Sequence, residues 1–234
     1  MKLVCLNVWC GKLHDPLVEF LKENSDADIF CFQELLLAKS SMQFVSEFRP
    51  GLLNELKNVL TGFRSFFVEA NDNFGQAIFV RKKNYAEFGA DIILEGKEIV
   101  KFPETDLRRI VQSCCIGNLT VFNFHGFSTW PKIDTPERIR QSEKLLEYIS
   151  KFEGRKILCG DFNVWQDTKS VAMIEARMRN LVREIGVETT RVAKYSPDDR
   201  ISDYAFVSKE VKVKSFEIPD VIVSDHLPLI LEFE

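Results

Sequence analysis

Polar side chains that can bind a metal ion or move a proton stand at six places where apolar runs of the sequence end. They are Asn7, Gln33-Glu34, His125, the Gly-Asp-Phe-Asn stretch 160–163, Asp203 and the Ser-Asp-His stretch 224–226. In layered α/β proteins, ligand sites lie beyond the ends of strands, where loops meet over a rigid scaffold. Six such placements in one chain therefore favour a common site.

Each of these residues also has an ordinary structural explanation when taken alone. Glu34 fits a carboxylate at a helix start, Asp161 and Asn163 fit turn positions, and His125 fits a core histidine. Asp203 fits a strand cap and Asp225 an N-cap. Together the places supply three Asp, one Glu, two Asn and two of the three His, which is the mixture that metal-assisted hydrolysis of a phosphate ester requires. The third histidine, His14, stands beside a predicted helix start and receives no role.

A carboxylate alone does not suffice for this chemistry. The pKa of water is about 12 units above that of an ordinary Asp, so full proton transfer to Asp costs roughly 16 kcal/mol. A divalent cation lowers the pKa of bound water and screens the phosphate. Mg²⁺ or Mn²⁺ prefers oxygen ligands and needs only one or two carboxylates.

The order of these motifs along the chain resembles the endonuclease/exonuclease/phosphatase (DNase I-like) superfamily. The resemblance runs from residue 7 to residue 226 and includes the run Asp-Tyr-Ala-Phe-Val-Ser at 203–208. It implies an α/β fold, a four-layer α/β/β/α sandwich of two mixed sheets with the site at one end between them. It also implies a hydrolase acting on phosphate ester bonds, with Mg²⁺ or Mn²⁺ as cofactor.

The same resemblance implies the metal ligands. Glu34 takes the position of the principal ligand, Asn7 lies beside it, and Asp225 contributes.

The resemblance further implies the catalytic side chains. Asp161 orients or partly deprotonates the attacking water, and Asn163 donates an N–H to a phosphate oxygen. Asp203 holds His226 in its charged form, in which it binds the phosphate and stabilises the transition state. His125 takes the position of a second donor near the leaving oxygen.

Two departures from the family pattern bear on the substrate. Trp9 stands two residues after Asn7, where the abasic-site endonucleases of the family carry Asp, so one metal ligand is absent. The Asn-x-Trp start is more similar to the sphingomyelinase-like and uncharacterised bacterial branches. The chain also lacks the Thr-Trp-Asn start and the Gly-Asp-Thr-Asn motif of tyrosyl-DNA phosphodiesterases.

Three function classes follow for the substrate of such a site. The first is a nuclease-like phosphodiesterase, with DNA among its possible substrates. The second is a phosphomonoesterase or a sphingomyelinase-like lipid phosphodiesterase. The third is a non-catalytic binding module on the same scaffold, which the complete set of acidic and His positions disfavours.

Arg109, Trp130 and Arg191 are the expected substrate-binding residues, with further phosphate-facing candidates at Arg108, Lys132, Arg138, Arg140 and Lys194. Solvated surface charge is the simpler explanation for each of these cations, and a hydrophobic plug explains segment 127–130 as well as stacking on a substrate does.

The elements that must position these residues follow from hydrophobic periodicity and turn residues. A helix opens at Asp15-Pro16 with Asp15 as its N-cap, and another runs from Thr135-Pro136 to residue 152. Further helices cover 51–61 and 170–179. The predicted strands are 2–8, 28–33, 64–70, 76–81, 88–95, 107–116, 119–124, 156–159, 204–207, 211–218 and 227–233. Strands from end to end, without a linker, predict one domain over residues 1–234.

Composition narrows the class of protein further. The 234 residues are 45% hydrophobic with a net charge of −4, which disfavours a protein that holds nucleic acid by bulk charge. Six cysteines, five of them in apolar strand-like runs, favour free buried thiols in a reducing cytoplasm. No run of 18 apolar residues exists, so we expect no stable membrane insertion and a monomeric cytoplasmic enzyme. Of the 20 Phe, seven on predicted strands are expected between the two sheets: Phe30, Phe32, Phe79, Phe122, Phe124, Phe206 and Phe233.

Overall fold

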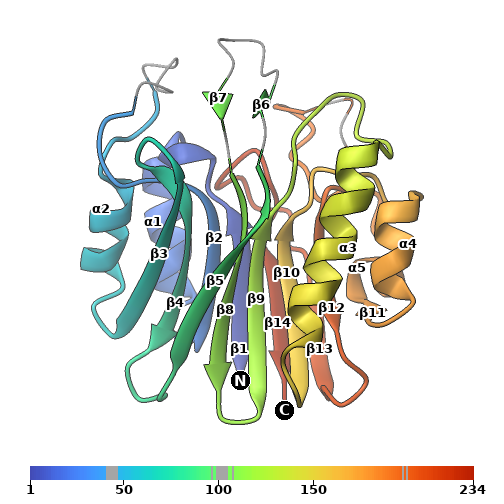
Figure 1. Ribbon diagram of the computed structural model, residues 1–234. Coiled ribbons are helices and arrows are strands. Elements are labelled where there is room, and N and C mark those ends of the chain that lie inside the picture. The colour runs from blue at the N-terminus through green and yellow to red at the C-terminus, as the bar shows by residue number, and fades with distance from the viewer. Residues whose placement is uncertain (41–46, 96, 99–104, 107, 197, 199) are drawn as a thin grey trace.

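Two six-stranded mixed sheets face each other and carry helices on their outer faces (Figure 1). The computed structural model describes residues 1–40, 47–95, 97–98, 105–106, 108–196, 198 and 200–234. The layers stack as helix, sheet, sheet, helix, so the predicted α/β/β/α sandwich is confirmed.

The first sheet is centred on a parallel pair of strands. Its order is β13 (Val213–Glu217), β14 (Leu229–Phe233), β1 (Lys2–Asn7), β2 (Ile29–Leu36), β4 (Phe74–Arg81) and β3 (Phe63–Asn71). Strands β1 and β2 run parallel, and their crossover contains helix α1 (His14–Glu23). A short 3-10 helix, η1 (Trp9–Gly11), follows β1, and α2 (Leu52–Val59) covers the same sheet.

The second sheet repeats this plan. Its order is β11 (Arg179–Asn180), β12 (Asp203–Val207), β10 (Arg155–Asp161), β9 (Leu119–His125), β8 (Arg109–Ile116) and β5 (Glu87–Leu94). Strands β9 and β10 run parallel, with α3 (Pro136–Ser150) in their crossover. Helices α4 (Lys169–Glu175) and α5 (Leu181–Ile185) follow β10. A separate two-stranded ribbon joins β6 (Lys97–Glu98) and β7 (Thr105–Asp106).

The central parallel pairs of both sheets end at the same edge of the sandwich, the upper edge in Figure 1. Carboxyl ends of parallel strands are where α/β proteins gather ligand-binding residues. The candidate residues at the ends of β1, β2, β9 and β10 therefore meet there.

The predicted position of the phenylalanines is wrong for six of the seven residues. Phe30, Phe32 and Phe79 pack between the first sheet and its helices, and Phe122, Phe124 and Phe206 do so on the second sheet. Phe233 is the one of the seven that lies between the sheets, where Cys, Ile, Leu and Val side chains dominate. Successive strand residues point to opposite faces, and on these buried strands both faces are apolar.

The predicted elements are present, with shifts at their ends. Helix α1 begins at His14, and Leu13 is its N-cap, so Asp15 lies in the first turn rather than at the cap. Thr135 caps α3 as predicted, accepting a hydrogen bond from the Arg138 N–H. Strands β6, β7 and β11 and helix α5 are additions to the predicted set. Residue 107, the first of the predicted strand 107–116, lies outside the described residues.

The six cysteines are free thiols, and five of them lie in strands as predicted. In the part of the chain that the structure describes, every helix is too short or too polar to cross a membrane.

Candidate active site

Strand alternation brings four of the candidate side chains to the inner faces of the two sheets. Leu3 and Cys5 face the layer between the sheets, so Asn7 continues that face. His125, Asp161 and Asp203 continue the corresponding face of the second sheet, and Asp161 is in register with both of the others. The four side chains therefore meet at the open end of the layer between the sheets.

Glu34 reaches the same place by a backbone irregularity. The pairing of β2 with β4 shifts between Phe32 and Leu35, which marks a bulge, and Glu34 has a φ of 58°. A left-handed conformation in a residue other than Gly is uncommon and accompanies sites that redirect a side chain. The bulge directs the Glu34 carboxylate to Asn7, whose Nδ2 donates to Oε1 at 3.0 Å.

The centre of the cluster is rich in carboxylate oxygen. Asn7 Nδ2 also donates to Asp161 Oδ2 at 3.1 Å. His125 Nε2 lies 3.8 Å from Glu34 Oε1 and 3.9 Å from Asp161 Oδ2. One ligand atom from each of Glu34, His125 and Asp161 falls within 4.8 Å of the others, which is close enough to surround one metal ion. The Asn7 amide nitrogen faces the carboxylates, while its oxygen accepts from the Trp9 N–H at 3.0 Å.

A carboxylate–imidazole pair stands on the other side of Asp161. His226 Nδ1 lies 2.8 Å from Asp203 Oδ1, and His226 Nε2 lies 3.5 Å from Asp161 Oδ2. The Thr190 hydroxyl donates to Asp203 Oδ2 at 2.8 Å and fixes the carboxylate from the far side. Thr190 is a supporting residue that sequence reasoning missed, and no local pattern marks it.

The loop after β10 is shaped by two special backbone positions. Gly160 has a φ of 146°, and a Cβ there would lie 1.8 Å from the Phe124 carbonyl oxygen, so only glycine fits. Asn163 has a φ of 54°, its N–H donates to Asp161 Oδ1 at 2.9 Å, and its Nδ2 donates to the Gly126 carbonyl at 3.4 Å. This tight loop holds the Asp161 carboxylate in one orientation.

A buried amide network joins the two sheets directly below the cluster. Gln33 Nε2 donates to Asn123 Oδ1 at 2.6 Å, and Asn123 Nδ2 donates to Gln112 Oε1 at 2.9 Å. Gln76 Nε2 donates to the Asn123 carbonyl at 2.8 Å. Buried polar networks rigidify a core to the extent that their members are paired, and among the described residues Gln33 Oε1 is the atom of this network that lacks a partner. Gln33 thus connects the sheets, one residue before Glu34.

The two site histidines differ in their protonation. Burial, together with the nearby charge of Arg109, lowers the pKa of His125 to about 3, so His125 is neutral at pH 7. Burial and Arg191 act in the same direction on His226, but Asp203, Asp225 and Asp161 outweigh them and raise its pKa above the ordinary value. His226 is therefore the more readily charged of the two.

The Asp161 carboxyl remains ionised despite its burial. Desolvation alone would raise its pKa, but the charges of His226 and Lys132 hold that pKa far below the usual range. For Glu34 desolvation dominates, and together with the charge of Asp225 it raises the pKa. The charge of a bound cation would lower the pKa of Glu34 again. A raised carboxylate pKa is therefore expected where several carboxylates meet to bind a cation.

Arg191 closes one side of the site. Its guanidinium donates to Asp225 Oδ2 at 2.7 Å and to the Ser196 hydroxyl at 2.8 Å, and it contacts His226 Nε2. Residues 191 and 226 also form an isolated β-bridge. Arg191 and Asp225 are thus brought to the cluster, as the sequence predicted.

The other expected substrate contacts are arranged less directly. Arg109 is brought near the cluster but is only 2% exposed, and burial lowers its pKa to about 10 against the opposing charges of Asp161 and Glu34. Trp130 is 63% exposed and packs edge-on against Trp165, at 5.4 Å between ring centroids. Arg138, a further candidate for phosphate contact, is fully buried and donates to the carbonyls of Thr129, Pro131 and Ile133, so it serves the loop instead.

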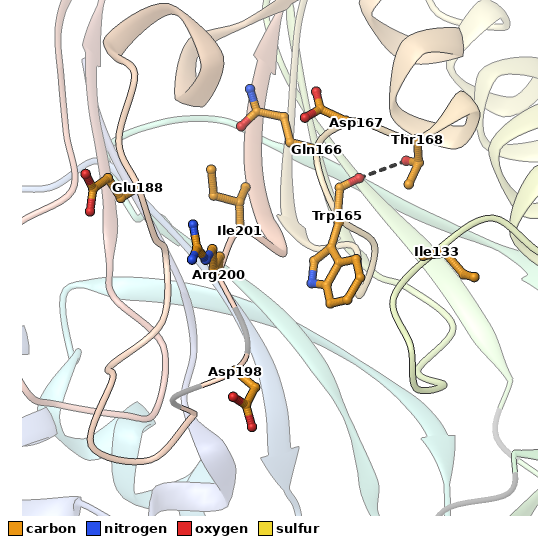
Figure 2. Close-up of a pocket in the computed structure, with 9 residues that line it drawn as sticks. All are labelled: Ile133, Trp165, Gln166, Asp167, Thr168, Glu188, Asp198, Arg200 and Ile201. Atoms are coloured by element: carbon orange, nitrogen blue, oxygen red, sulfur yellow. Dashed lines mark hydrogen bonds between the residues drawn. The ribbon is translucent and has the colours of Figure 1, made fainter.

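An open hollow of about 490 Å³ lies beside the loops that carry the cluster (Figure 2). We call it the Trp165 pocket, and its walls include Trp165, Gln166, Glu188, Asp198, Arg200 and Ile201. Its segments adjoin the cluster in sequence, since Trp165 follows Asn163 by two residues and Ile201 precedes Asp203 by two.

A family model, a curated relative and several solved structures are similar to this chain. A model described as the Endonuclease/Exonuclease/phosphatase family matches residues 4–226. A UPF0294 protein of Vibrio cholerae is 30% identical over 122 residues, which are 49% of this chain and 40% of that protein. The match therefore covers less than half of the relative's length.

Two solved structures with phosphate-ester chemistry in their names share the fold. A mannosyl-6-phosphatase of Bacteroides thetaiotaomicron aligns over 100% of this chain and 99% of its own, with TM-score 0.72 and 18% identity. TDP2 of D. rerio, complexed with a single-stranded DNA product, aligns over 100% and 98%, with TM-score 0.71 and 17% identity. At these identities the likeness concerns the fold.

Proposed function

The chain belongs to the Endonuclease/Exonuclease/phosphatase family, and from that premise we propose that it is a divalent-metal-dependent hydrolase of phosphodiesters. The observation that carries the proposal is the single cluster in which Glu34, Asp161 and the Asp203–His226 pair converge. Carboxylates for a cation, a fixed acceptor for water and a charged donor for phosphate are the parts that such a reaction needs.

The donor set fits a hard divalent cation. Glu34 and Asp161 present carboxylate oxygens. Asp225 supplies a third carboxylate nearby, since it contacts Arg191 and its Oδ1 lies 3.8 Å from His226 Nε2. Mg²⁺ and Mn²⁺ prefer such oxygen ligands and retain several waters. When bound, the ion supplies a lowered water pKa and neutralises phosphate charge. Asn7 Nδ2 donates to both Glu34 and Asp161 and so bridges them, and Asn7 joins the ligands only if its amide turns.

Asp161 orients the attacking water in this proposal. Its lowered pKa makes it a weak base, so it accepts a hydrogen bond from the water rather than storing the proton. The Asn163 N–H fixes Asp161 Oδ1, which leaves Oδ2 to face the cluster. Asp161 therefore contributes by positioning the attacking water, and its own position depends on the tight turn at Gly160.

The two histidines then donate to the phosphate in different ways. His226, held by Asp203 at Nδ1, directs Nε2 toward the Asp161 side of the cluster and binds a phosphate oxygen as a charged donor. Arg191 contacts that same Nε2, so a phosphate bound at His226 lies within reach of the Arg191 guanidinium as well. His125 stays neutral and donates near the leaving oxygen, while Asn163 Nδ2 serves a further phosphate oxygen.

Two aromatic pairs lie next to cluster residues in sequence and favour a diester over a monoester. Trp9, two residues after Asn7, packs on Tyr195 at 5.1 Å, and Trp165, two residues after Asn163, packs on Trp130 at 5.4 Å between ring centroids. A diester has an organic group on each side of its phosphate, and aromatic faces support such groups. Phosphomonoester hydrolysis is the second candidate, favoured by the mannosyl-6-phosphatase with the same fold.

The free thiols and the residues of the cluster bear on the cellular compartment and the oligomeric state that we propose. We infer a reducing cytoplasm from the six free thiols. We also propose that the enzyme acts as a monomer, since the residues of the cluster all come from one chain.

Bis-p-nitrophenyl phosphate and p-nitrophenyl phosphate test the reaction, each with Mg²⁺ or Mn²⁺ and with a chelator. We expect the diester to be cleaved faster, the chelator to stop turnover, and Glu34→Ala to be inactive. Glu23→Ala, an exposed carboxylate at the end of α1, is the matched control. Equal turnover of wild type and folded Glu34→Ala would overturn the proposal, and a faster monoester would favour the second candidate.

A further inference from the structure

The Trp165 pocket differs from the catalytic cluster in the charge of its walls. Its lining includes Asp167, Glu188, Asp198 and Arg200, and Asp167 is paired with Arg183 at 3.1 Å, which leaves an excess of one carboxylate. Carboxylates at neutral pH only accept hydrogen bonds, so a ligand must bring donors. The pocket also repels further phosphates, because like charges at close range are unfavourable.

The walls of the pocket are tied to the catalytic residues through the backbone. Trp165 follows Asn163 by two residues, and its N–H donates to the Lys132 carbonyl at 2.8 Å. The Thr190 N–H donates to the Arg200 carbonyl at 2.9 Å, while its hydroxyl donates to Asp203. A group in the pocket therefore lies next to the Asn163 and Asp203 ends of the cluster, within the reach of a substrate whose phosphate is bound there.

The Trp165 indole provides a flat apolar face in this acidic surrounding. Trp130 packs against it with an interplanar angle of 88°, which fixes the ring, and Ile133 completes an apolar rim. Figure 2 shows Trp165 and Ile133 among the side chains that line the pocket. At about 490 Å³ the pocket lies within the usual range of small-molecule sites, roughly 300–1,000 Å³.

We propose that the Trp165 pocket binds the alcohol part of the substrate, and that this alcohol is an uncharged, hydroxyl-rich ring such as a sugar or cyclitol. The inference rests on the proposed function of the neighbouring cluster. Ring hydroxyls donate to Glu188 and Asp198, and the C–H face of the ring lies on the Trp165 indole. Arg200 offsets one of the two carboxylates that Arg183 leaves unpaired, so the excess negative charge of the walls is small, and the carboxylates disfavour a nucleic acid chain.

Three alcohols compared in the same ester bond test this assignment. Glycerophosphoinositol, glycerophosphocholine and a thymidine dinucleotide are the diesters; inositol 1-phosphate, phosphocholine and thymidine monophosphate are the monoesters. Each is assayed with Mg²⁺ or Mn²⁺ against bis-p-nitrophenyl phosphate. We expect the inositol esters to have the highest kcat/KM, at least about tenfold above the choline and thymidine esters, as lost hydrogen bonds to charged groups predict.

Variants of the pocket sharpen the readout. Glu188→Gln combined with Asp198→Asn, and separately Trp165→Ala, should lower the ratio of kcat/KM for inositol esters to that for bis-p-nitrophenyl phosphate by about tenfold. Asp220→Asn, an exposed carboxylate elsewhere, should leave the ratio unchanged. Isothermal titration of inositol 1-phosphate into an inactive Asp161→Asn background gives a readout independent of turnover.

The outcomes separate the two proposals. Absence of metal-dependent turnover on every ester would overturn the proposed function. Turnover of bis-p-nitrophenyl phosphate without preference for inositol, or with a ratio unchanged in the variants, would overturn the pocket assignment alone. A preference for the choline or the thymidine esters would assign the pocket to a cation or a nucleobase instead.

Discussion

The two aromatic pairs next to the candidate cluster differ in the charge around them. We call Trp9–Tyr195 the basic flank and Trp165–Trp130 the acidic flank. On one flank, Lys12 lies 4.3 Å over the ring of Trp9, and Lys194 lies 5.2 Å over the ring of Tyr195. On the other flank, Trp165 is surrounded by the carboxylates of the Trp165 pocket. Aromatic faces accept many organic groups, so the charge around each pair decides which group binds. From this contrast we expect the anionic or extended part of the substrate to lie toward Trp9 and the neutral polar part toward Trp165.

Removing the centre that the flanks share should have the largest effect. Asp161→Asn keeps the shape of the side chain but loses the charge that orients water and attracts His226. We expect kcat to fall by at least about 10² to 10³ fold on every ester, the range for one preorganised polar group. Steady-state kinetics with unchanged thermal unfolding would show that the loss is chemical. A variant that lost turnover on one ester class only would place Asp161 on a flank rather than at the centre.

The loop beneath the acidic flank should give the next largest effect. Arg138 is fully buried and donates to the carbonyls of Thr129, Pro131 and Ile133, so it holds the segment that carries Trp130. Arg138→Met leaves those carbonyls without this donor, and we expect a loss of about 3 kcal/mol in the free energy of unfolding. Urea unfolding measures the loss, with Arg140→Met on the exposed face of α3 as control.

The same variant sharpens the comparison of the flanks. Selectivity for hydroxyl-rich alcohols should fall in Arg138→Met, because Trp130 no longer fixes Trp165. Affinity for an anionic strand on the Trp9 side should stay the same. Equal loss on both sides would mean that Arg138 supports the whole fold and not the acidic flank.

The pH dependence of stability tests the different environments of the two histidines. The pKa of His125 falls to about 3 in the fold from an ordinary 6.5, so the unfolded chain alone takes up a proton as the pH drops below 6.5. Stability is therefore lost toward acid, by about 1.36 kcal/mol per pH unit or about 2 kcal/mol between pH 6.5 and 5. The raised pKa of His226 has the opposite sign, since its contribution is present below 6.5 and lost as the pH rises.

His125→Asn isolates this effect. Urea unfolding of both proteins in a chelator should show a difference in stability that shrinks by about 2 kcal/mol from pH 6.5 to 5, with His226 common to both. Parallel curves would show that His125 is protonated in the fold and lies in a more polar place than its burial indicates.

Sequence patterns predicted the strands because strand alternation is local, and the family resemblance predicted the end of the sandwich at which the candidate residues meet. The positions of Asn7 and His125 could be predicted because each stands where an apolar run stops, and because side chains alternate between the two faces of a strand. The same pattern failed for Phe30 and Phe122, because both faces of a central strand are apolar and only tertiary packing decides which one meets a helix.

The rest of the site depends on features that no local pattern encodes. Glu34 was found by family resemblance, but the bulge that directs it depends on the pairing of β2 with β4. Thr190 supports Asp203 from a loop 13 residues away in sequence. Arg138 looked like a phosphate contact because its charge was visible and its three carbonyl partners were not. Long-range partners therefore separate the catalytic from the structural side chains.

The smallest effect we expect concerns Lys194 on the basic flank. Its side chain is exposed, so its contribution to anion binding is modest and screened by salt. In an inactive Asp161→Asn background, Lys194→Ala should weaken binding of a single-stranded oligonucleotide by about threefold at low salt. It should also reduce the slope of log affinity against log salt by about 0.7, the value for one phosphate contact on a single strand. Lys209→Ala, remote from both flanks beyond β12, is the matched control. A slope that Lys194→Ala leaves unchanged would remove the basic flank from the path of the anionic group, and the charge contrast between the flanks would then rest on the Trp165 pocket alone.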